Sequence, residues 1–229
     1  MTADHDRWAD SYEKELDRAV GFVGLRHEFF SRAKAEELLG LARRHLGSAR
    51  EIDALDVGCG VGLADSHLQG CFASLTGTDL SRTALDRAAR RNPWARYEPA
   101  AGGRLPFSEE SFDLVFAMCV LQELEPDERA EFASELARVT RAGGLVVFFE
   151  HNPRNPLTRL AVRRTEVAAG IRFLGPGDLA ELLAAQRLVV VEQAHILLFP
   201  ARVRPLLAVE RLLRHLPLGA QHYTAARRV

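Results

Sequence analysis

The sequence of 229 residues contains little of what builds disulfide-rich, membrane-spanning or nucleic-acid-binding proteins. Cysteine occurs three times, at Cys59, Cys71 and Cys119, and an odd number in apolar surroundings suits reduced thiols. No apolar run approaches the roughly 20 residues that a bilayer span needs. The N-terminus also lacks a basic stretch followed by an apolar one. These absences predict a cytoplasmic protein without disulfide bonds and without a membrane partner.

The net charge is only -1, but the charges are unevenly distributed along the chain. Residues 51–150 hold 17 acidic and 9 basic side chains, whereas residues 151–229 hold 5 acidic and 12 basic ones. No basic patch alternates with aromatic residues, so we expect no nucleic acid as a partner. The basic C-terminal third is either a solvated surface or a feature that favours an anionic substrate. Nothing in the sequence specifies an oligomeric state.

Short buried strands alternate with amphipathic helices between residues 29 and 149. The predicted strands cover residues 52–57, 73–78, 95–98, 112–118 and 145–149. The predicted helices cover residues 29–46, 63–69, 82–91 and 126–140, with Ser81 placed to cap the third of them. Such alternation is typical of a doubly wound parallel sheet, in which ligands bind beyond the carboxyl ends of the strands.

The C-terminal third has a less regular pattern. We expect helices over residues 156–169, 178–185 and 205–216 and a long apolar strand over residues 188–199. The last segment, residues 220–229, is expected to return as an edge strand. Because no long helical crossover is needed between antiparallel neighbours, the two terminal strands are predicted to pair as a hairpin.

The most informative segment is Ala54-Leu-Asp-Val-Gly-Cys-Gly-Val-Gly62. It contains the end of a predicted strand and the turn after it. Its glycines, Gly58, Gly60 and Gly62, permit a sharp turn and a close approach of backbone to a ligand. Asp56 precedes the turn, and Asp79 ends the next strand, where a carboxylate can accept hydrogen bonds from ribose hydroxyls. The last two glycines are two positions apart instead of the three of a dinucleotide fingerprint. The loop therefore favours a nucleoside with a cationic, phosphate-free end.

Four segments resemble the class I S-adenosylmethionine-dependent methyltransferases in order and spacing. They are Leu55-Asp-Val-Gly-Cys-Gly-Val-Gly62, Gly77-Thr-Asp-Leu-Ser81, Leu105-Pro-Phe-Ser-Glu-Glu-Ser-Phe-Asp-Leu-Val115 and Arg138-Val-Thr-Arg-Ala-Gly-Gly-Leu145. The resemblance covers roughly residues 50–150. It implies a doubly wound, mostly parallel seven-stranded α/β sheet with helices on both faces and a C-terminal antiparallel strand.

The resemblance also implies one methyltransferase domain over residues 1–229, with S-adenosyl-L-methionine as cofactor. Residues 1–50 would form a helical lid, residues 51–150 the cofactor-binding core, and residues 151–229 a substrate-side cap with the C-terminal strands. Asp56 and the three glycines would line the methionine end, Asp79 would hold the ribose and Leu80 would flank the adenine. The remaining implied cofactor contacts are Tyr12, Cys59, Leu105, Pro106, Met118 and Cys119.

Two parts of the implied cofactor site need separate interpretation: the contact to the adenine amine and the segment that closes over the cofactor. Many relatives carry an acidic residue shortly before Leu-Pro-Phe, where this chain has Ala100-Ala-Gly-Gly103, so we expect backbone groups to hold the adenine amine. Trp8, Ala9 and Tyr12 resemble an aromatic segment that closes over the cofactor in relatives. Packing at a helix surface is the alternative for Tyr12.

A polar segment, Glu150-His-Asn-Pro-Arg-Asn-Pro156, follows the strand over residues 145–149. His151 has an unperturbed pKa near 6.5 and is suited to act as a general base. Glu150 either orients it or only ends the strand. This segment and Leu216-Pro-Leu-Gly-Ala-Gln-His-Tyr223 resemble a branch of bacterial small-molecule methyltransferases. The alternative for His151 is a structural residue that bonds a carbonyl, and Gln122 and Glu123 are either substrate contacts or a solvated helix entry.

We expect methyl transfer to a small-molecule acceptor, with a hydroxyl oxygen favoured over carbon or nitrogen. Arginines at the start of the expected cap are candidates for binding an acidic or phosphorylated acceptor: Arg154, Arg159, Arg163 and Arg164. No metal is expected, because no Cys or His pair has ligand spacing. The Asn-Pro-Pro-aromatic motif expected where amide or adenine nitrogens are methylated is absent. The alternative function is a cofactor-binding protein of the same fold without transferase activity, regulatory or recruited to cyclisation.

Overall fold

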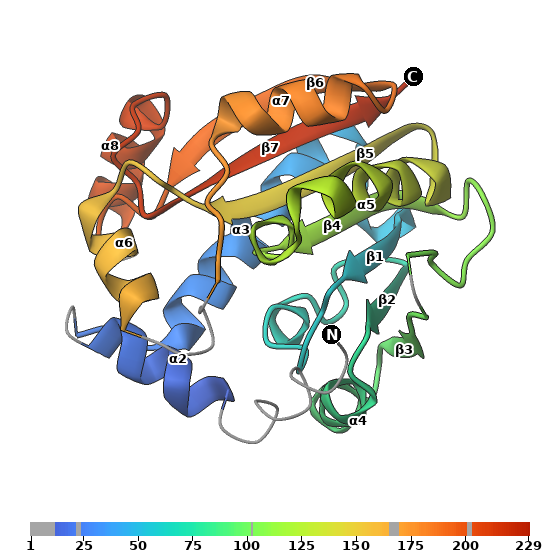
Figure 1. Ribbon diagram of the computed structural model, residues 1–229, viewed down its shortest axis with the longest axis horizontal. Coiled ribbons are helices and arrows are strands. Elements are labelled where there is room, and N and C mark those ends of the chain that lie inside the picture. The colour runs from blue at the N-terminus through green and yellow to red at the C-terminus, as the bar shows by residue number, and fades with distance from the viewer. Residues whose placement is uncertain (1–11, 22–23, 102, 165–169, 201–202) are drawn as a thin grey trace.

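A computed structural model describes residues 12–21, 24–101, 103–164, 170–200 and 203–229. Seven strands form one sheet in the order β3-β2-β1-β4-β5-β7-β6 (Figure 1). The strands are β1 (Asp53–Val57), β2 (Ser74–Asp79), β3 (Arg96–Pro99), β4 (Phe112–Met118), β5 (Thr140–His151), β6 (Leu188–Ile196) and β7 (Gln221–Arg228). The first five strands pair in parallel, and β7 runs antiparallel to both of its neighbours. The predicted fold is confirmed.

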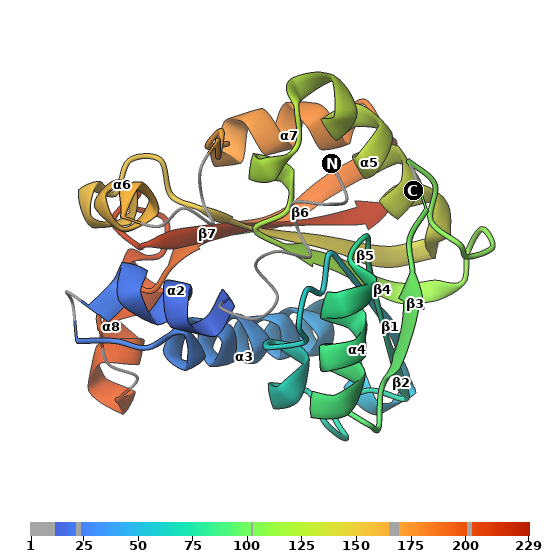
Figure 2. The same ribbon diagram turned by 60° about the horizontal axis from the view of Figure 1, so that its bottom comes forward.

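Helices cover both faces of this sheet, as Figure 2 shows. The helices are α2 (Tyr12–Val20), α3 (His27–His45), α4 (Arg82–Arg91), α5 (Pro126–Val139), α6 (Pro156–Arg163), α7 (Pro176–Ala184) and α8 (Arg204–Leu213). On one face, Leu38 and Leu41 of α3 belong to a core cluster with Phe116 of β4. On the other face, Leu136 of α5 and Leu183 of α7 belong to a second cluster.

The sequence of β5 explains why the middle of the sheet offers no ligand site. Successive side chains of a strand point to opposite faces. Leu145, Val147 and Phe149 accordingly lie in one core cluster, and Val146 and Phe148 lie in the other, all of them fully buried. Each such side chain contributes roughly 1.5–3 kcal/mol of burial energy. The described core residues of β5 therefore leave no room for a ligand on either face of this strand.

The helix predicted over residues 63–69 is wrong. The chain forms only a short 3-10 turn there, η3 (Asp65–His67). The side chain of Asp65 is buried and accepts a hydrogen bond from the hydroxyl of Tyr97 at 2.7 Å. A turn that directs this carboxylate inward replaces the regular helix.

The position of the last strand also differs from the prediction. β7 lies between β5 and β6, so β6 is the edge strand. The antiparallel pairing of β6 with β7 is confirmed, but α8 separates the two strands in the chain, so they do not form a simple hairpin. Because Gln221 of β7 pairs with His151 of β5, β7 begins at the edge of the sheet where the parallel strands end.

Several predicted element boundaries are confirmed closely. The helix over residues 82–91 and the strand over residues 112–118 have the predicted bounds, and Ser81 accepts a hydrogen bond from the backbone N–H of Ala84 as an N-cap. Asn155 caps α6 by accepting from the N–H groups of Leu157 and Thr158. None of the helices in the described ranges is long and apolar enough to cross a membrane.

Candidate functional site

The glycine loop begins where β1 ends and is held against β2. The N–H groups of Gly58 and Cys59 both donate to the carbonyl of Thr78, at 2.8 and 3.1 Å. Gly58, Gly60 and Gly62 have φ angles of +77°, +53° and +69°, a region that favours glycine. A Cβ at Gly58 would lie 2.5 Å from a methyl group of Val120, whereas a Cβ at Gly60 would meet nothing within 4 Å. Gly60 therefore faces open space.

Asp79 ends β2 beside this loop and fixes its shape. Its Oδ2 accepts a hydrogen bond from the N–H of Gly60 at 2.9 Å, and its Oδ1 accepts from the N–H of Ser81 at 2.9 Å. A carboxylate oxygen can accept more than one hydrogen bond. Asp79 can therefore hold the loop and still accept hydrogen bonds from a ligand hydroxyl.

Asp56 and Asp65 form a buried acidic pair beneath the loop. The two residues are 3% and 0% exposed. Burial first, and then the neighbouring Asp65, raise the pKa of Asp56 well above its usual value, and burial raises the pKa of Asp65. Two neighbouring carboxylates in a buried site cannot both ionise cheaply, so each favours a protonated partner.

Tyr97 and Asn92 complete this network. The Tyr97 hydroxyl donates to Asp65, and the Asn92 amide donates both to the Tyr97 oxygen at 3.0 Å and to the carbonyl of Gly62 at 2.9 Å. Oδ1 of Asp56 and Oδ1 of Asp65 are buried without a hydrogen-bond partner in the described part of the chain. The sequence pattern indicated Asp56 but not Asp65, Asn92 or Tyr97. These three residues lie in a turn, at a helix end and on a strand, and no local pattern connects them to Asp56.

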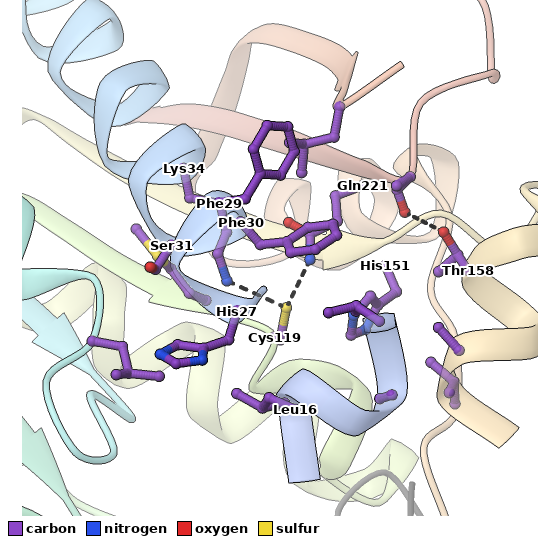
Figure 3. Close-up of a pocket in the computed structure, with 18 of the residues that line it drawn as sticks. Leu16, His27, Phe29, Phe30, Ser31, Lys34, Cys119, His151, Thr158 and Gln221 are labelled. Atoms are coloured by element: carbon purple, nitrogen blue, oxygen red, sulfur yellow. Dashed lines mark hydrogen bonds between the residues drawn. The ribbon is translucent and has the colours of Figure 1, made fainter. Parts of the chain in front are cut away.

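A pocket of about 330 Å³ opens in front of the glycine loop. Its walls come from α2, α3 and α6, from the ends of β1, β4 and β5, and from the segment after β6 (Figure 3). Most of the lining is apolar; it includes Leu16, Val20, Phe29, Phe30, Ala161, Val162, Leu197 and Phe199. Asp56, Gly58, Cys59, Gly60, Met118, Cys119 and His151 also line it. The pocket therefore joins the predicted glycine loop to the predicted base.

His151 bonds to Gln122 instead of to its neighbour in sequence. Nδ1 of His151 lies 2.9 Å from Oε1 and 2.7 Å from Nε2 of the Gln122 amide. Burial first, and then the charge of Lys34, lower the pKa of His151 to about 3, so the ring is neutral at neutral pH. The ring packs edge-on against Phe173.

Glu150 does not orient His151. Its side chain is fully buried, and its Oε1 accepts a hydrogen bond from the N–H of Leu121 at 3.1 Å. The reason is the pleat of β5, which sends consecutive side chains to opposite faces. Burial raises the pKa of Glu150 to about 8. Glu150 therefore holds the loop that carries Gln122, and acts on His151 only through that loop.

Lys34 was not among the predicted site residues, yet its ammonium group enters the pocket. Nζ lies 3.9 Å from Sγ of Cys119, and Nε2 of Gln221 lies 3.8 Å from the same sulfur (Figure 3). Burial raises the pKa of Cys119 to about 11, so this sulfur is a neutral thiol and a weak acceptor. Within the described ranges, no carboxylate lies within ion-pair distance of Lys34. At longer range its charge favours the ionised forms of the buried carboxyls of Asp56 and Glu150.

Other predicted residues lie elsewhere. Leu105 is buried in the core, Pro106 and Leu80 are exposed, and none of the three lines the pocket as described. Tyr12 begins α2, but its side chain, like Trp8 and Ala9, falls outside the described residues.

Gln122 and Glu123 both line the pocket, Gln122 as a buried residue. Arg159 and Arg163 are exposed and do not line it. Among the residues that the structure describes, no group of three or more His, Cys, Asp or Glu side chains is arranged to hold a metal ion.

A family model described as a methyltransferase domain matches residues 55–148. The chain is 35% identical over 156 residues to a phosphatidylethanolamine N-methyltransferase of Cereibacter sphaeroides, covering 64% of this chain and 74% of that protein. It is 34% identical over 122 residues to a malonyl-[acyl-carrier protein] O-methyltransferase of Erwinia billingiae, covering 53% of this chain and 46% of that one. Together with the fold, these matches show that the chain belongs to the class I S-adenosylmethionine-dependent methyltransferases.

A solved structure shares the whole fold. The S-adenosylmethionine-dependent methyltransferase of Thermotoga maritima superposes with a TM-score of 0.67 at 15% identity, covering 100% of both chains. The chain nevertheless spans only about half the length of some curated relatives that it matches.

Proposed function

We propose that the protein transfers a methyl group from S-adenosyl-L-methionine to a hydroxyl oxygen of a small-molecule acceptor. The observation that carries this proposal is one continuous pocket that has Asp56 and Gly60 in its lining together with His151. The relatives named above include an O-methyltransferase and an N-methyltransferase, so family membership alone leaves the acceptor atom open. The arrangement around His151 favours oxygen.

The residues of the glycine loop fit the cofactor. Oδ1 of Asp56 is buried without a partner among the described residues, and the open space over Gly60 would be filled by a Cβ. We assign Asp56, with Gly58, Gly60 and Gly62, to the methionine end of the cofactor, and Asp79 to its ribose. Met118, Cys59 and Cys119 would lie beside it. Bound there, S-adenosyl-L-methionine supplies a methyl carbon made electrophilic by a sulfonium.

His151 is the proposed general base. When Nδ1–H donates to Oε1 of Gln122, Nε2 is left as a hydrogen-bond acceptor, and within the described residues it has no protein partner. Nε2 would accept the proton that the hydroxyl loses while its oxygen bonds to the methyl carbon and the carbon–sulfur bond breaks. Gln122 acts as a positioning residue that holds the ring through Nδ1, and its amide oxygen must face Nδ1–H for Nε2 to be the base.

The low pKa of His151 limits what the ring can do alone. A base with a pKa of about 3 gains a proton readily only after the acceptor oxygen has begun to develop positive charge. The same observation favours a second candidate, an acceptor that needs no base before transfer, such as an amine nitrogen, or a cofactor-binding protein without transferase activity. Product analysis separates these candidates.

Lys34 replaces Arg159 and Arg163 as the candidate for binding an anionic acceptor. Its ammonium group lies inside an apolar pocket without a carboxylate partner among the described residues, whereas the two arginines are exposed. A desolvated cation is stabilised by an anion far more strongly than an exposed one. We therefore propose an acceptor with a negatively charged or strongly polar group next to an apolar body.

The pocket walls suggest roles for the two ends of the chain within one domain. Leu16 of α2 and Phe30 of α3 line it from the N-terminal side, and Ala161 of α6 and Phe199 line it from the C-terminal side. We propose that residues 1–50 act as a lid and residues 151–229 as an acceptor cap. The three free thiols support a cytoplasmic location.

The test begins with calorimetry of the purified chain with S-adenosylhomocysteine, the demethylated product. We expect saturable binding that Asp56→Asn weakens at least tenfold. A panel of acceptors is then assayed by release of S-adenosylhomocysteine, with the methylated atom identified by mass spectrometry and NMR. A product methylated at nitrogen would support the amine acceptor, and binding with no product on a broad panel would support a cofactor-binding protein. A folded chain with no affinity would overturn all of these candidates.

A further inference from the structure

One end of the molecule exposes an unusual number of aliphatic side chains. On α6, Leu157 and Leu160 are 54% and 44% exposed, and on α8, Val209 and Leu212 are 41% and 75% exposed. Leu216 and Leu218, just after α8, are 36% and 50% exposed. Val209, Leu212 and Leu216 follow one another at spacings of three and four residues, which places them on one stripe of the helix and its extension.

The charged residues in and next to α6 and α8 are almost all basic, although Arg214 forms an ion pair with Glu192 of β6. Residues 153–164 contain four arginines and no acidic residue, and residues 203–218 contain three arginines and one acidic residue, Glu210. Glu210 is buried and accepts hydrogen bonds from the N–H groups of Leu197 and Leu198, so it does not offset the surface charge. Arg154, Arg159, Arg163 and Arg211 are exposed.

Hydrogen bonds join these elements into one surface. The side chain of Asn155, the cap of α6, donates to the carbonyl of Leu218 at 2.8 Å, and Thr158 of α6 donates to the carbonyl of Ala220 at 2.8 Å. Glu210 attaches α8 to the segment that follows β6. In both overall views, α6 and α8 lie at the same end of the molecule (Figures 1 and 2). We call the exposed aliphatic and arginine side chains of this end the α6–α8 surface.

The α6–α8 surface borders the pocket. Leu157 is more than half exposed and also lines the pocket, so it lies at the rim. Ala161 and Val162 of the same helix line the pocket wall, and so do Leu197 and Leu198, the residues that α8 is attached to. Apolar surface therefore continues from the outside of the molecule into the pocket.

We propose that the α6–α8 surface docks on an anionic phospholipid bilayer, so that the pocket takes an amphiphilic, lipid-like acceptor from the membrane surface. Aliphatic stripes flanked by arginines match this partner, because the side chains enter the headgroup region while the guanidinium groups meet lipid phosphates. This departs from the expectation of no membrane partner, which considered only spanning segments. The proposal of a lipid-like acceptor rests on the proposed methyl transfer. The proposal that the surface docks on a bilayer does not depend on it.

The first experiment is co-sedimentation of the full chain with vesicles of phosphatidylcholine alone and of phosphatidylcholine mixed with phosphatidylglycerol. We expect binding to the mixed vesicles that weakens as salt is raised, and little binding to the neutral ones. The paired variants Leu160→Ser/Leu212→Ser and Arg159→Glu/Arg163→Glu, at exposed positions outside the pocket lining, should each reduce the partition coefficient about tenfold or more. An unmodified chain that does not sediment with the mixed vesicles overturns the proposal.

Matched controls change equally exposed side chains elsewhere. Val189→Ser/Val191→Ser alters two exposed valines of β6, and Arg82→Glu/Arg90→Glu reverses two exposed charges on α4. Both control pairs should bind the mixed vesicles as the unmodified chain does. If either control lost as much binding as the α6–α8 variants, docking would not be specific to the α6–α8 surface. Size-exclusion chromatography tests a protein partner: a dimer that Leu212→Ser dissociates, without vesicle binding, would overturn the proposal and assign the surface to a second copy.

Calorimetry with S-adenosylhomocysteine on the same variants separates the two proposals. We expect every α6–α8 variant to keep the cofactor-product affinity of the unmodified chain. Vesicle binding by a chain with no affinity for S-adenosylhomocysteine would remove the proposed function and leave the docking in place. A chain that binds S-adenosylhomocysteine but not the mixed vesicles would overturn only the docking proposal.

Discussion

His151 and Gln122 are hydrogen-bonded across the carboxyl ends of β5 and β4, with Nδ1 of His151 2.9 Å from Oε1 of Gln122 although 29 residues separate them in sequence. A hydrogen bond on one ring nitrogen decides the state of the other. When the amide oxygen of Gln122 accepts from Nδ1–H, Nε2 is the acceptor available for a substrate hydroxyl; when the amide N–H donates to Nδ1 instead, Nε2 carries the proton. The contact therefore sets whether the ring can take a proton.

Replacing Gln122 should change both rate and pH dependence. Gln122→Glu places a carboxylate beside Nδ1, which raises the pKa of His151 and should move the acidic limb of the kcat–pH profile to higher pH. Gln122→Leu leaves the tautomer unspecified and should lower kcat about tenfold to hundredfold. Gln69→Glu, at an exposed position, is the matched control. An unchanged profile in Gln122→Glu would assign His151 a structural role.

Two glycines of the same loop should respond differently to alanine. A Cβ at Gly62 would lie 2.6 Å from the amide of Asn92 and 3.0 Å from the hydroxyl of Tyr97, so Gly62→Ala should lower the free energy of unfolding by about 3 kcal/mol. Gly60→Ala meets no atom and should cost about 1 kcal/mol for its left-handed backbone. Urea unfolding measures both.

The same two substitutions should have the opposite order of effect on ligand binding, with Gly60→Ala the more harmful. Because a Cβ at Gly60 projects into the open space of the pocket, Gly60→Ala should weaken binding of S-adenosylhomocysteine at least tenfold in a folded protein. Calorimetry at a temperature where both variants are folded gives the comparison. Unchanged affinity in Gly60→Ala would show that the ligand does not approach this part of the backbone.

Lys34 should determine affinity for an anionic acceptor. Lys34→Gln removes the ammonium group, and we expect KM for such an acceptor to rise about tenfold while binding of a neutral analogue changes little. Arg159→Gln, outside the pocket, should leave both values unchanged when the acceptor is supplied free in solution. Equal KM values in Lys34→Gln and the unmodified chain would argue against an anionic group beside Cys119.

Glu150 should make the protein less stable at alkaline pH. Its pKa is raised to about 8 in the folded chain by burial, from 4.5 in an ordinary glutamate. The folded state thus keeps a proton that the unfolded state releases; this stability is fully present below pH 4.5 and is lost as pH rises through 8. Glu150→Gln imitates the protonated form. At pH above 8 it should be more stable than the unmodified chain by about 2 kcal/mol.

The measurement is urea unfolding of both proteins across the pH range from slightly acid to alkaline. Glu109→Gln, at an exposed position, should follow the unmodified chain throughout. The difference between Glu150→Gln and the unmodified chain should grow towards high pH. A difference that does not vary with pH would mean that the Glu150 carboxyl is ionised in the folded state.

Local patterns predicted those parts of the fold that local physics decides. The helix over residues 82–91 has its N-cap and an apolar face within ten residues, and the strand over residues 112–118 is buried on both faces, so each is specified by its own sequence. The segment over residues 63–69 has helical spacing as well. It fails to form that helix because Asp65 is needed in the buried network with Asp56 and Tyr97.

The candidate site shows the same division. Asp56, Gly58, Gly60, Met118, Cys119 and His151 all line one pocket because they lie at or just after strand ends, and parallel strands end at one edge of a sheet. Lys34 could not be found in this way, because it is one charged residue on a helix that reaches the pocket only after α3 packs on the sheet. Gln122 was expected to be either a substrate contact or part of a solvated helix entry. Its contact with His151 was not predicted, because that contact joins the ends of two strands.

The sequence by itself determined the alternation of strands and helices, the turn after β1 and the class of cofactor, since each depends on residues close together in the chain. The tertiary structure alone decided that β7 lies inside the sheet, that Gln221 at its start reaches Cys119, and that Lys34 brings a cation to the pocket. These outcomes depend on which distant segments pack together, and a side chain's partner across the fold leaves no trace in its neighbours along the chain.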